Sequence, residues 1–210
     1  MLIARQKRWL GVFLALPGVA AILLPFSEDV SPWRVIRETA GMASGTSAAN
    51  FILMAIPFLV ALTILDWQVR RARAIPIGTW RIVVGHATAA GAIASVLVTT
   101  FANHFEPLGD ASIAVLPAWA AIVVYGALVA RCLGRMRPAD ETVCVAMNSA
   151  YLPNAILCLV VFGMPGTFGG WQVGAYVTLV ACVCSIIQIV LVMRTRKESP
   201  IDGRGPIGFS

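Results

Sequence analysis

Residues 144–161 read CVAMNSAYLPNAILCLVV, an apolar stretch with polar and helix-unfriendly residues in its middle. No Asp, Glu, Lys or Arg interrupts it, and with its flanks it reaches the length of about 20 residues that a membrane-spanning helix needs. Polar side chains inside such a helix commonly form hydrogen bonds with neighbouring helices. The stretch therefore predicts a spanning helix that packs against others. The unusual residues are Asn148, Ser149, Tyr151, Pro153 and Asn154.

The rest of the chain has the same character. Its 210 residues are 59% hydrophobic and only 12% charged, whereas a soluble domain carries about 25% charged residues. A bilayer must therefore form part of its solvent. We expect an all-α, polytopic (multi-pass) integral membrane helix bundle with six transmembrane helices in one domain, residues 1–193. The expected spans are 9–26, 47–65, 82–101, 112–130, 142–162 and 171–193.

The basic residues predict the orientation. If the six spans alternate in direction, fourteen of the 16 Lys and Arg lie on the side that holds both termini. Cytoplasmic loops carry this excess, so both termini are expected in the cytoplasm. The short loops suit a bacterial inner membrane, and residues 194–210 are expected to be a disordered cytoplasmic tail. The expected partners are the lipid bilayer and other membrane proteins or a second copy, and no nucleic acid is expected.

The first apolar segment could be a membrane-spanning helix or a signal peptide. Its basic start, apolar run and small residues at Gly18 and Ala20 are also typical of a signal peptide. Because the apolar run continues through Leu24, an uncleaved first helix is favoured, and cleavage would leave five spans.

After this segment, Ser31 can cap a helix and Pro32 suits its first turn, so a short surface helix and an ordinary ordered loop are both open.

Helix packing is predicted from small residues and from proline. The third segment is rich in Gly and Ala, and Gly91 and Ser95 fit the small-xxx-small spacing that lets helices approach closely. We expect this segment to be the packing centre of the bundle, with dimerisation through the same face as the alternative. Pro153 is expected to kink the fifth helix, because it removes the hydrogen bond to the carbonyl of Ser149.

A candidate polar or binding cluster consists of His86, Asn148, Tyr151 and Asn154. His86 is the one ionisable side chain of the Asp, Glu, His, Lys and Arg set inside an expected span, and such residues are functional candidates. A hydrogen-bonded neutral imidazole is favoured over a proton relay, because no carboxylate partner lies in the spans. Asn148 and Tyr151 share a helix face and Asn154 lies on another. This favours a role for these side chains in hydrogen bonds that hold the fifth helix to other helices, over a functional cavity.

No motif for catalysis is found. There are no paired carboxylates, no phosphate-binding loop and no metal-ligand cluster, and His104 with Glu106 offers too few ligands for a metal site. No cofactor and no metal are expected. The favoured function is a non-enzymatic accessory or scaffold subunit of a membrane assembly. A small transporter with a cavity near the fifth helix is the alternative, and a membrane enzyme using His86 or His104 is the third hypothesis.

Overall fold

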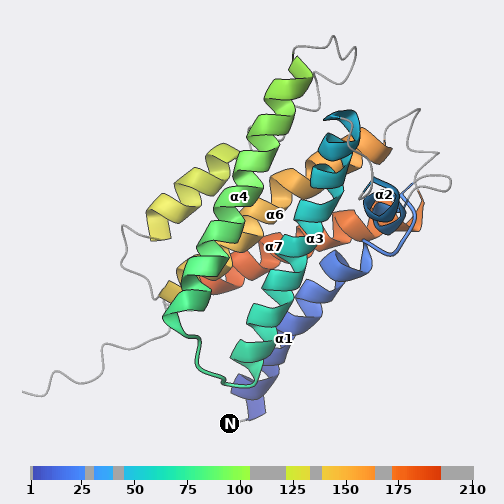
Figure 1. Ribbon diagram of the computed structural model, residues 1–210. Helices are drawn as coiled ribbons and strands as arrows, with labels where there is room; N and C mark the ends of the chain where they lie inside the picture. The colour runs from blue at the N-terminus through green and yellow to red at the C-terminus, as the bar shows by residue number, and fades with distance from the viewer. Residues whose placement is uncertain are drawn as a thin grey trace, which may run out of the picture.

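The computed structural model describes residues 2–26, 31–39, 45–104, 122–132, 139–163 and 172–194. All regular structure within these ranges is helical, so the expected all-α class is confirmed (Figure 1). The helices are α1 (Leu2–Ala20), α2 (Pro32–Thr39), α3 (Gly45–Ala72), α4 (Thr79–His104), the unlabelled helix Ile122–Cys132, α6 (Ala139–Gly163) and α7 (Val173–Arg194).

The centre of the bundle is α6, which contacts α3, α4 and α7. In the most apolar 18 residues of α6, within Ala139–Leu159, 89% of the residues are buried, against 22% in the most apolar 18 residues of α4, within Thr79–Leu97. The expectation that residues 82–101 form the packing centre is therefore wrong. The physical reason is that lipid offers no hydrogen-bond partners. The helix with the polar side chains therefore gains most from a position between other helices.

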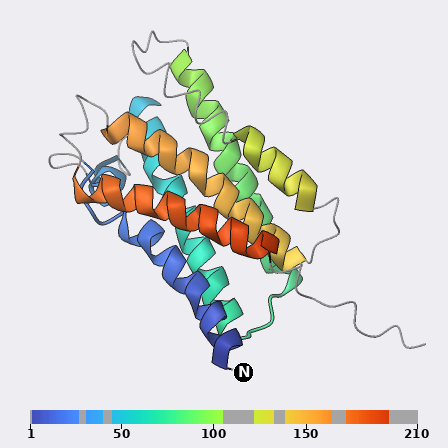
Figure 2. The ribbon, with the colours of Figure 1, turned by 180° about the vertical axis from the view of Figure 1, so that it is seen from behind.

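The other helices surround α6. Helix α1 lies along α3 and α7, and Figure 2 shows α6 and α7 side by side from behind. The Ile122–Cys132 helix lies beside α4 in both views, and Ile122 packs against Val96 and Leu157. The outward face of α7 carries large apolar side chains, among them Val180, Val183 and Ile187. Such a face suits contact with lipid chains.

Three of the described helices are long and apolar enough to cross a membrane: Thr79–Leu97, Ala139–Leu159 and Val173–Arg194. They fall within or overlap the expected third, fifth and sixth spans, and they agree with an integral membrane protein. Two shorter apolar helices, Trp9–Ala20 and Ile122–Cys132, overlap the expected first and fourth spans. The count of six spans therefore stays a prediction. The expected tail lies outside the described residues from position 195 onward.

The chain after α1 differs from the expected first span of residues 9–26. The helix ends at Ala20, and the following residues form turns that bury the Phe26 side chain. The Gly174 N–H donates to the Pro25 carbonyl at 2.8 Å, and a Cβ on Gly174 would lie 2.5 Å from the Leu24 carbonyl oxygen. The absence of a side chain at Gly174 thus lets these turns dock on the start of α7.

Residues 32–39 form a helix, so the alternative of an ordinary loop is wrong, while the place of this helix at a membrane surface stays a prediction. The Arg34 N–H donates to the Ser31 hydroxyl oxygen at 3.2 Å, the expected N-terminal cap of α2. The Trp33 N–H donates to the Ile22 carbonyl at 3.1 Å, and Ile36 packs against a small apolar cluster that includes Phe26. These contacts hold α2 against the end of α1.

Candidate functional site

Helix α7 carries three buried polar side chains on one face: Thr178, Ser185 and Gln188. Their spacing of seven and three residues places them in line along the helix. The opposite face of the same helix is exposed and apolar. The buried side of α7 therefore carries three polar side chains among small and apolar ones, and it is turned toward the other helices.

Gln188 lies in a polar cluster that joins four helices. The Gln68 side chain on α3 donates from Nε2 to Oε1 of Gln188 at 2.9 Å and lies 3.4 Å from Sγ of Cys144 on α6. Gln188 in turn donates from Nε2 to the Gly11 carbonyl on α1 at 3.5 Å. Gln68 and Gln188 are both buried. Hydrogen bonds thus connect α1, α3, α6 and α7 at one level of the bundle.

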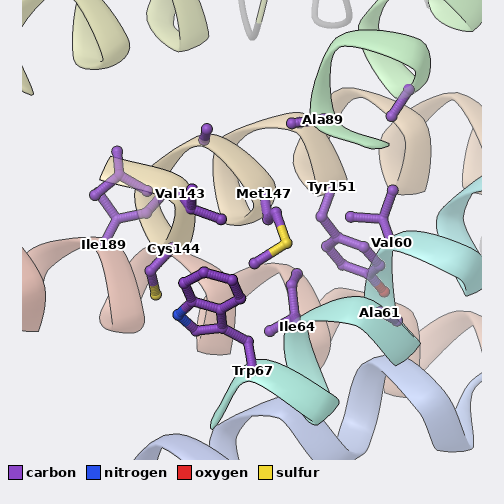
Figure 3. Close-up of a cluster of buried hydrophobic side chains, with 14 of the residues drawn as sticks. Val60, Ala61, Ile64, Trp67, Ala89, Val143, Cys144, Met147, Tyr151 and Ile189 are labelled. Atoms are coloured by element: carbon purple, nitrogen blue, oxygen red, sulfur yellow. The ribbon is translucent and has the colours of Figure 1, made fainter. Parts of the chain in front are cut away.

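Asn148 lies next to this cluster but bonds within its own helix. Its Nδ2 donates to the Cys144 carbonyl at 2.9 Å, whereas its fully buried Oδ1 has no partner among the described residues. The same is true of Nε1 of Trp67 and Oγ of Ser149. Figure 3 shows the Trp67 indole extending from α3 toward Cys144 and Met147. The cluster therefore retains hydrogen-bonding capacity in a place where lipid supplies none.

A first pocket, which we call the Pro32 pocket, lies between the end of α1 and helices α2, α3, α6 and α7. It leaves about 20 Å³ for the centre of a water molecule, and roughly 10–15 Å³ is enough to hold one. Its lining is mostly apolar with a few polar groups. Among the lining residues are Ile22, Pro32, Pro57, Tyr151, Cys158 and Thr178.

A second pocket, the Gln188 pocket, lies between α1, α3, α6 and α7. It leaves about 10 Å³ for the centre of a water molecule, so it is at the lower limit for holding one. Ser185 and Gln188 of α7 both belong to its lining. Among the lining residues are Leu14, Gly18, Ala61, Tyr151, Ser185 and Gln188.

Tyr151 is the member of the expected cluster that lines these pockets. The other members lie elsewhere in the fold. Asn154 faces α4, where its Nδ2 donates to the Ala92 carbonyl at 3.0 Å and its Oδ1 lies 3.2 Å from the Ser95 hydroxyl. His86 is half-buried on α4 and lines neither pocket. The structure therefore does not bring the four expected residues together around one site.

The residues expected to pack between helices differ in their surroundings. The Ser95 hydroxyl donates to Oδ1 of Asn154 at 3.2 Å, which forms a hydrogen bond between α4 and α6. Gly91 is exposed, and a Cβ added there would meet no atom of the described residues within 4 Å. Within the described residues, Gly91 thus makes no close contact between helices, and its role in packing stays a prediction. Gly85, six residues earlier, faces α6 instead. Pro153 is buried within α6, which continues through it as a helix.

Sequence reasoning missed the two glutamines. Gln188 carries an uncharged amide inside the sixth apolar segment, and a search for Asp, Glu, Lys and Arg alone passes over it. Counting every side chain with a hydrogen-bonding group in the spans would have found it. Gln68 lies three residues beyond the expected end of the second span, because α3 continues to Ala72. Its burial depends on the packing of α3 against α6.

The buried polar side chains of the described residues are all uncharged. Among the same residues, no group of three or more His, Cys, Asp and Glu has the arrangement of a metal site. The backbone of His104 belongs to the end of α4, but its side chain is outside the part that the structure describes. Glu106 lies outside the described residues altogether. The interior that is described therefore offers amides, hydroxyls and thiols.

No family model, curated protein or solved structure matches the chain.

Proposed function

We propose that this chain is a six-span protein of a bacterial inner membrane, with both termini in the cytoplasm, that conducts a small neutral polar solute. The single observation that carries the transport proposal is that three buried polar side chains of α7 line the two pockets. Thr178 lines the Pro32 pocket, and Ser185 and Gln188 line the Gln188 pocket, so one face borders both spaces. Interhelical pockets with a few polar groups are common ligand sites.

The chemistry of the lining supports a neutral solute. Amide and hydroxyl groups of Gln188, Ser185 and Thr178 can replace the hydrogen bonds that a polar molecule loses when it leaves water. An ion would also need charge compensation, because a charge within the hydrocarbon region costs several kcal/mol. The two pockets have room for about one water molecule each. The arrangement thus corresponds to a closed form, and passage of a larger solute requires the helices to move.

Transport is tested by reconstituting the full chain in liposomes and following osmotic shrinkage by light scattering. Water, urea and glycerol are offered separately. We expect protein-containing liposomes to exceed empty ones in permeability to at least one of these, and Gln188→Leu to remove the excess. Ile187→Leu, on the lipid-facing side of the same helix, is the matched control and should keep it. Equal permeability of loaded and empty liposomes to all three solutes would contradict the proposal.

The accessory-subunit hypothesis remains a second candidate, because α4 has an outward face of small residues. Ala87, Ala90, Gly91 and Ala94 are all exposed on it, and such a face lets another helix approach closely in a membrane. Native mass spectrometry of the gently solubilised protein tests this. A protein partner should be lost in Gly91→Phe and kept in Val183→Phe, a change on the exposed face of α7. A partner retained by both variants would speak against α4 as the contact.

A further inference from the structure

The two pockets have two lining residues in common. Gly18 and Tyr151 line both of them, and Gly18 has no side chain. Tyr151 is therefore the side chain that stands between the pockets in the described part of the bundle. We propose that the Tyr151 ring is the constriction of the pathway and that its displacement joins the Pro32 pocket to the Gln188 pocket. This inference rests on the proposed transport function and adds the residue that controls it.

The contacts of the ring support this role. Its hydroxyl oxygen and Cζ lie 3.5 and 3.6 Å from the position that a Cβ on Gly18 would occupy, and the Ala61 Cβ lies 3.3 Å from that position. Figure 3 shows the ring reaching from α6 toward Ala61 on α3. The phenol end thus meets α1 and α3 together. With 3% of its surface exposed, the ring fills the gap between three helices.

Small residues lie beside the phenol end of the ring. Gly18, Ala61 and Ala155 border the pockets beside it, and none of them has a side chain that could lock the phenol end in place. Aromatic side chains occupy discrete rotamers about χ1. Each pocket has room for about one water molecule, so a step of the ring to a second rotamer would accompany the helix movement that passage requires. A second position of the ring would open the boundary. The three buried polar side chains of α7, Thr178, Ser185 and Gln188, would then border one space.

A thiol in the Gln188 pocket tests the constriction without any transport measurement. The Ser185→Cys variant is made in a chain without its native cysteines and is placed in oriented membrane vesicles. A small water-soluble methanethiosulfonate is applied to the membrane face that carries α2, and the rate of modification is measured. The native cysteines to be replaced are Cys132, Cys144, Cys158, Cys182 and Cys184.

With Tyr151 present, the thiol of Ser185→Cys should react slowly from this face. Adding Tyr151→Ala should raise the rate at least about tenfold, which corresponds to removing a barrier of about 1.4 kcal/mol. Adding Tyr151→Phe, which keeps the ring, should leave the rate unchanged. An equal rate in all three proteins would overturn the proposal. Tyr151→Leu replaces Tyr151→Ala if the latter does not insert, because it removes the ring and retains more apolar volume.

Liposome permeability separates failure of this inference from failure of the proposed function. If Tyr151→Ala exposes the thiol but no variant conducts water, urea or glycerol, the constriction stands and the transport proposal fails. If the unaltered protein conducts while Tyr151→Ala leaves the thiol protected, transport stands and Tyr151 is not the constriction. Gly18→Ala adds a methyl group 3.5 Å from the Tyr151 hydroxyl oxygen, and it should lower the modification rate measured in the presence of Tyr151.

Discussion

The buried side-chain amides of Gln68 and Gln188 meet at 2.9 Å, although 120 residues separate them along the chain. The bond joins α3 to α7, and Gln188 extends it to the Gly11 carbonyl of α1. Side-chain hydrogen bonds between membrane helices contribute about 0.6 kcal/mol on average and up to about 1.7 kcal/mol. This pair therefore stabilises the packing of α3 against α7, and Gln188 is also part of the proposed pathway.

The first prediction concerns this pair. Gln68→Leu and Gln188→Leu should each lower the free energy of unfolding by about 1 kcal/mol, because each leaves a buried amide without its partner. The double variant should cost less than the sum of the two, because no unpaired amide remains. The free energies are measured by SDS titration in mixed micelles. Gln68→Leu combined with Asn154→Leu is the control, because these residues share no hydrogen bond among those described, and their costs should add.

The second prediction compares two glycines of α4. A Cβ on Gly85 would lie 2.5 Å from Cγ1 of Val143, which is completely buried on α6. Gly85→Ala should therefore lower the free energy of unfolding by about 1–3 kcal/mol, the usual cost of overpacking. Gly91→Ala meets no atom within 4 Å and should stay within about 0.5 kcal/mol of the unaltered protein. Equal costs in the same titration would show that α4 packs through a different face.

The third prediction compares two asparagines of α6 that are both completely buried. Asn154→Leu removes a hydrogen bond to the Ala92 carbonyl on α4, whereas Asn148→Leu removes a bond within α6. Asn154→Leu should cost about 1 kcal/mol of unfolding free energy. Asn148→Leu should cost less, because it also removes the Oδ1 acceptor that has no partner among the described residues. Thermal unfolding in detergent, followed by tryptophan fluorescence, ranks the two, and the reverse order would contradict the prediction.

The fourth prediction is that α1 stays attached to the mature protein. Gly18 lies at the ring of Tyr151, and the Gly11 carbonyl accepts a hydrogen bond from Gln188, so α1 forms one wall of the Gln188 pocket. The intact mass of the protein purified from its host membrane should therefore include residues 2–20. A mass that begins at Ala21 would show that the signal peptide alternative is correct and that the bundle forms without α1.

Much of the fold could be predicted from the sequence. The apolar segments gave the positions of α4, α6 and α7 to within a few residues, because hydrophobic length is a local property of the chain. Ser31 and Pro32 marked the start of α2, because a cap acts within one turn. The end of α1 was missed, because the apolar composition continues past Ala20 while the backbone changes to turns. These turns combine local hydrogen bonds, such as that from the Leu23 N–H to the Ala20 carbonyl, with the bond from the Gly174 N–H.

The candidate site could be predicted only in part. Tyr151 was expected to belong to a polar cluster, and it does line both pockets, but His86 and Asn154 lie elsewhere. The glutamine pair was missed, since neither residue reveals that it has a partner on a distant helix. The small-xxx-small spacing selected Gly91, whereas Gly85 makes the close contact with α6. Spacing defines the faces of a helix without saying which face meets a neighbour.

The sequence by itself determined that this protein is helical and suited to a membrane, because apolar length and the distribution of charge are written residue by residue. Tertiary structure alone decided that α6 occupies the centre, that Gln68 meets Gln188, and that Tyr151 stands between two pockets. These relationships depend on which helix faces meet. That choice is made by the packing and hydrogen bonding of all the helices together, which lipid cannot replace.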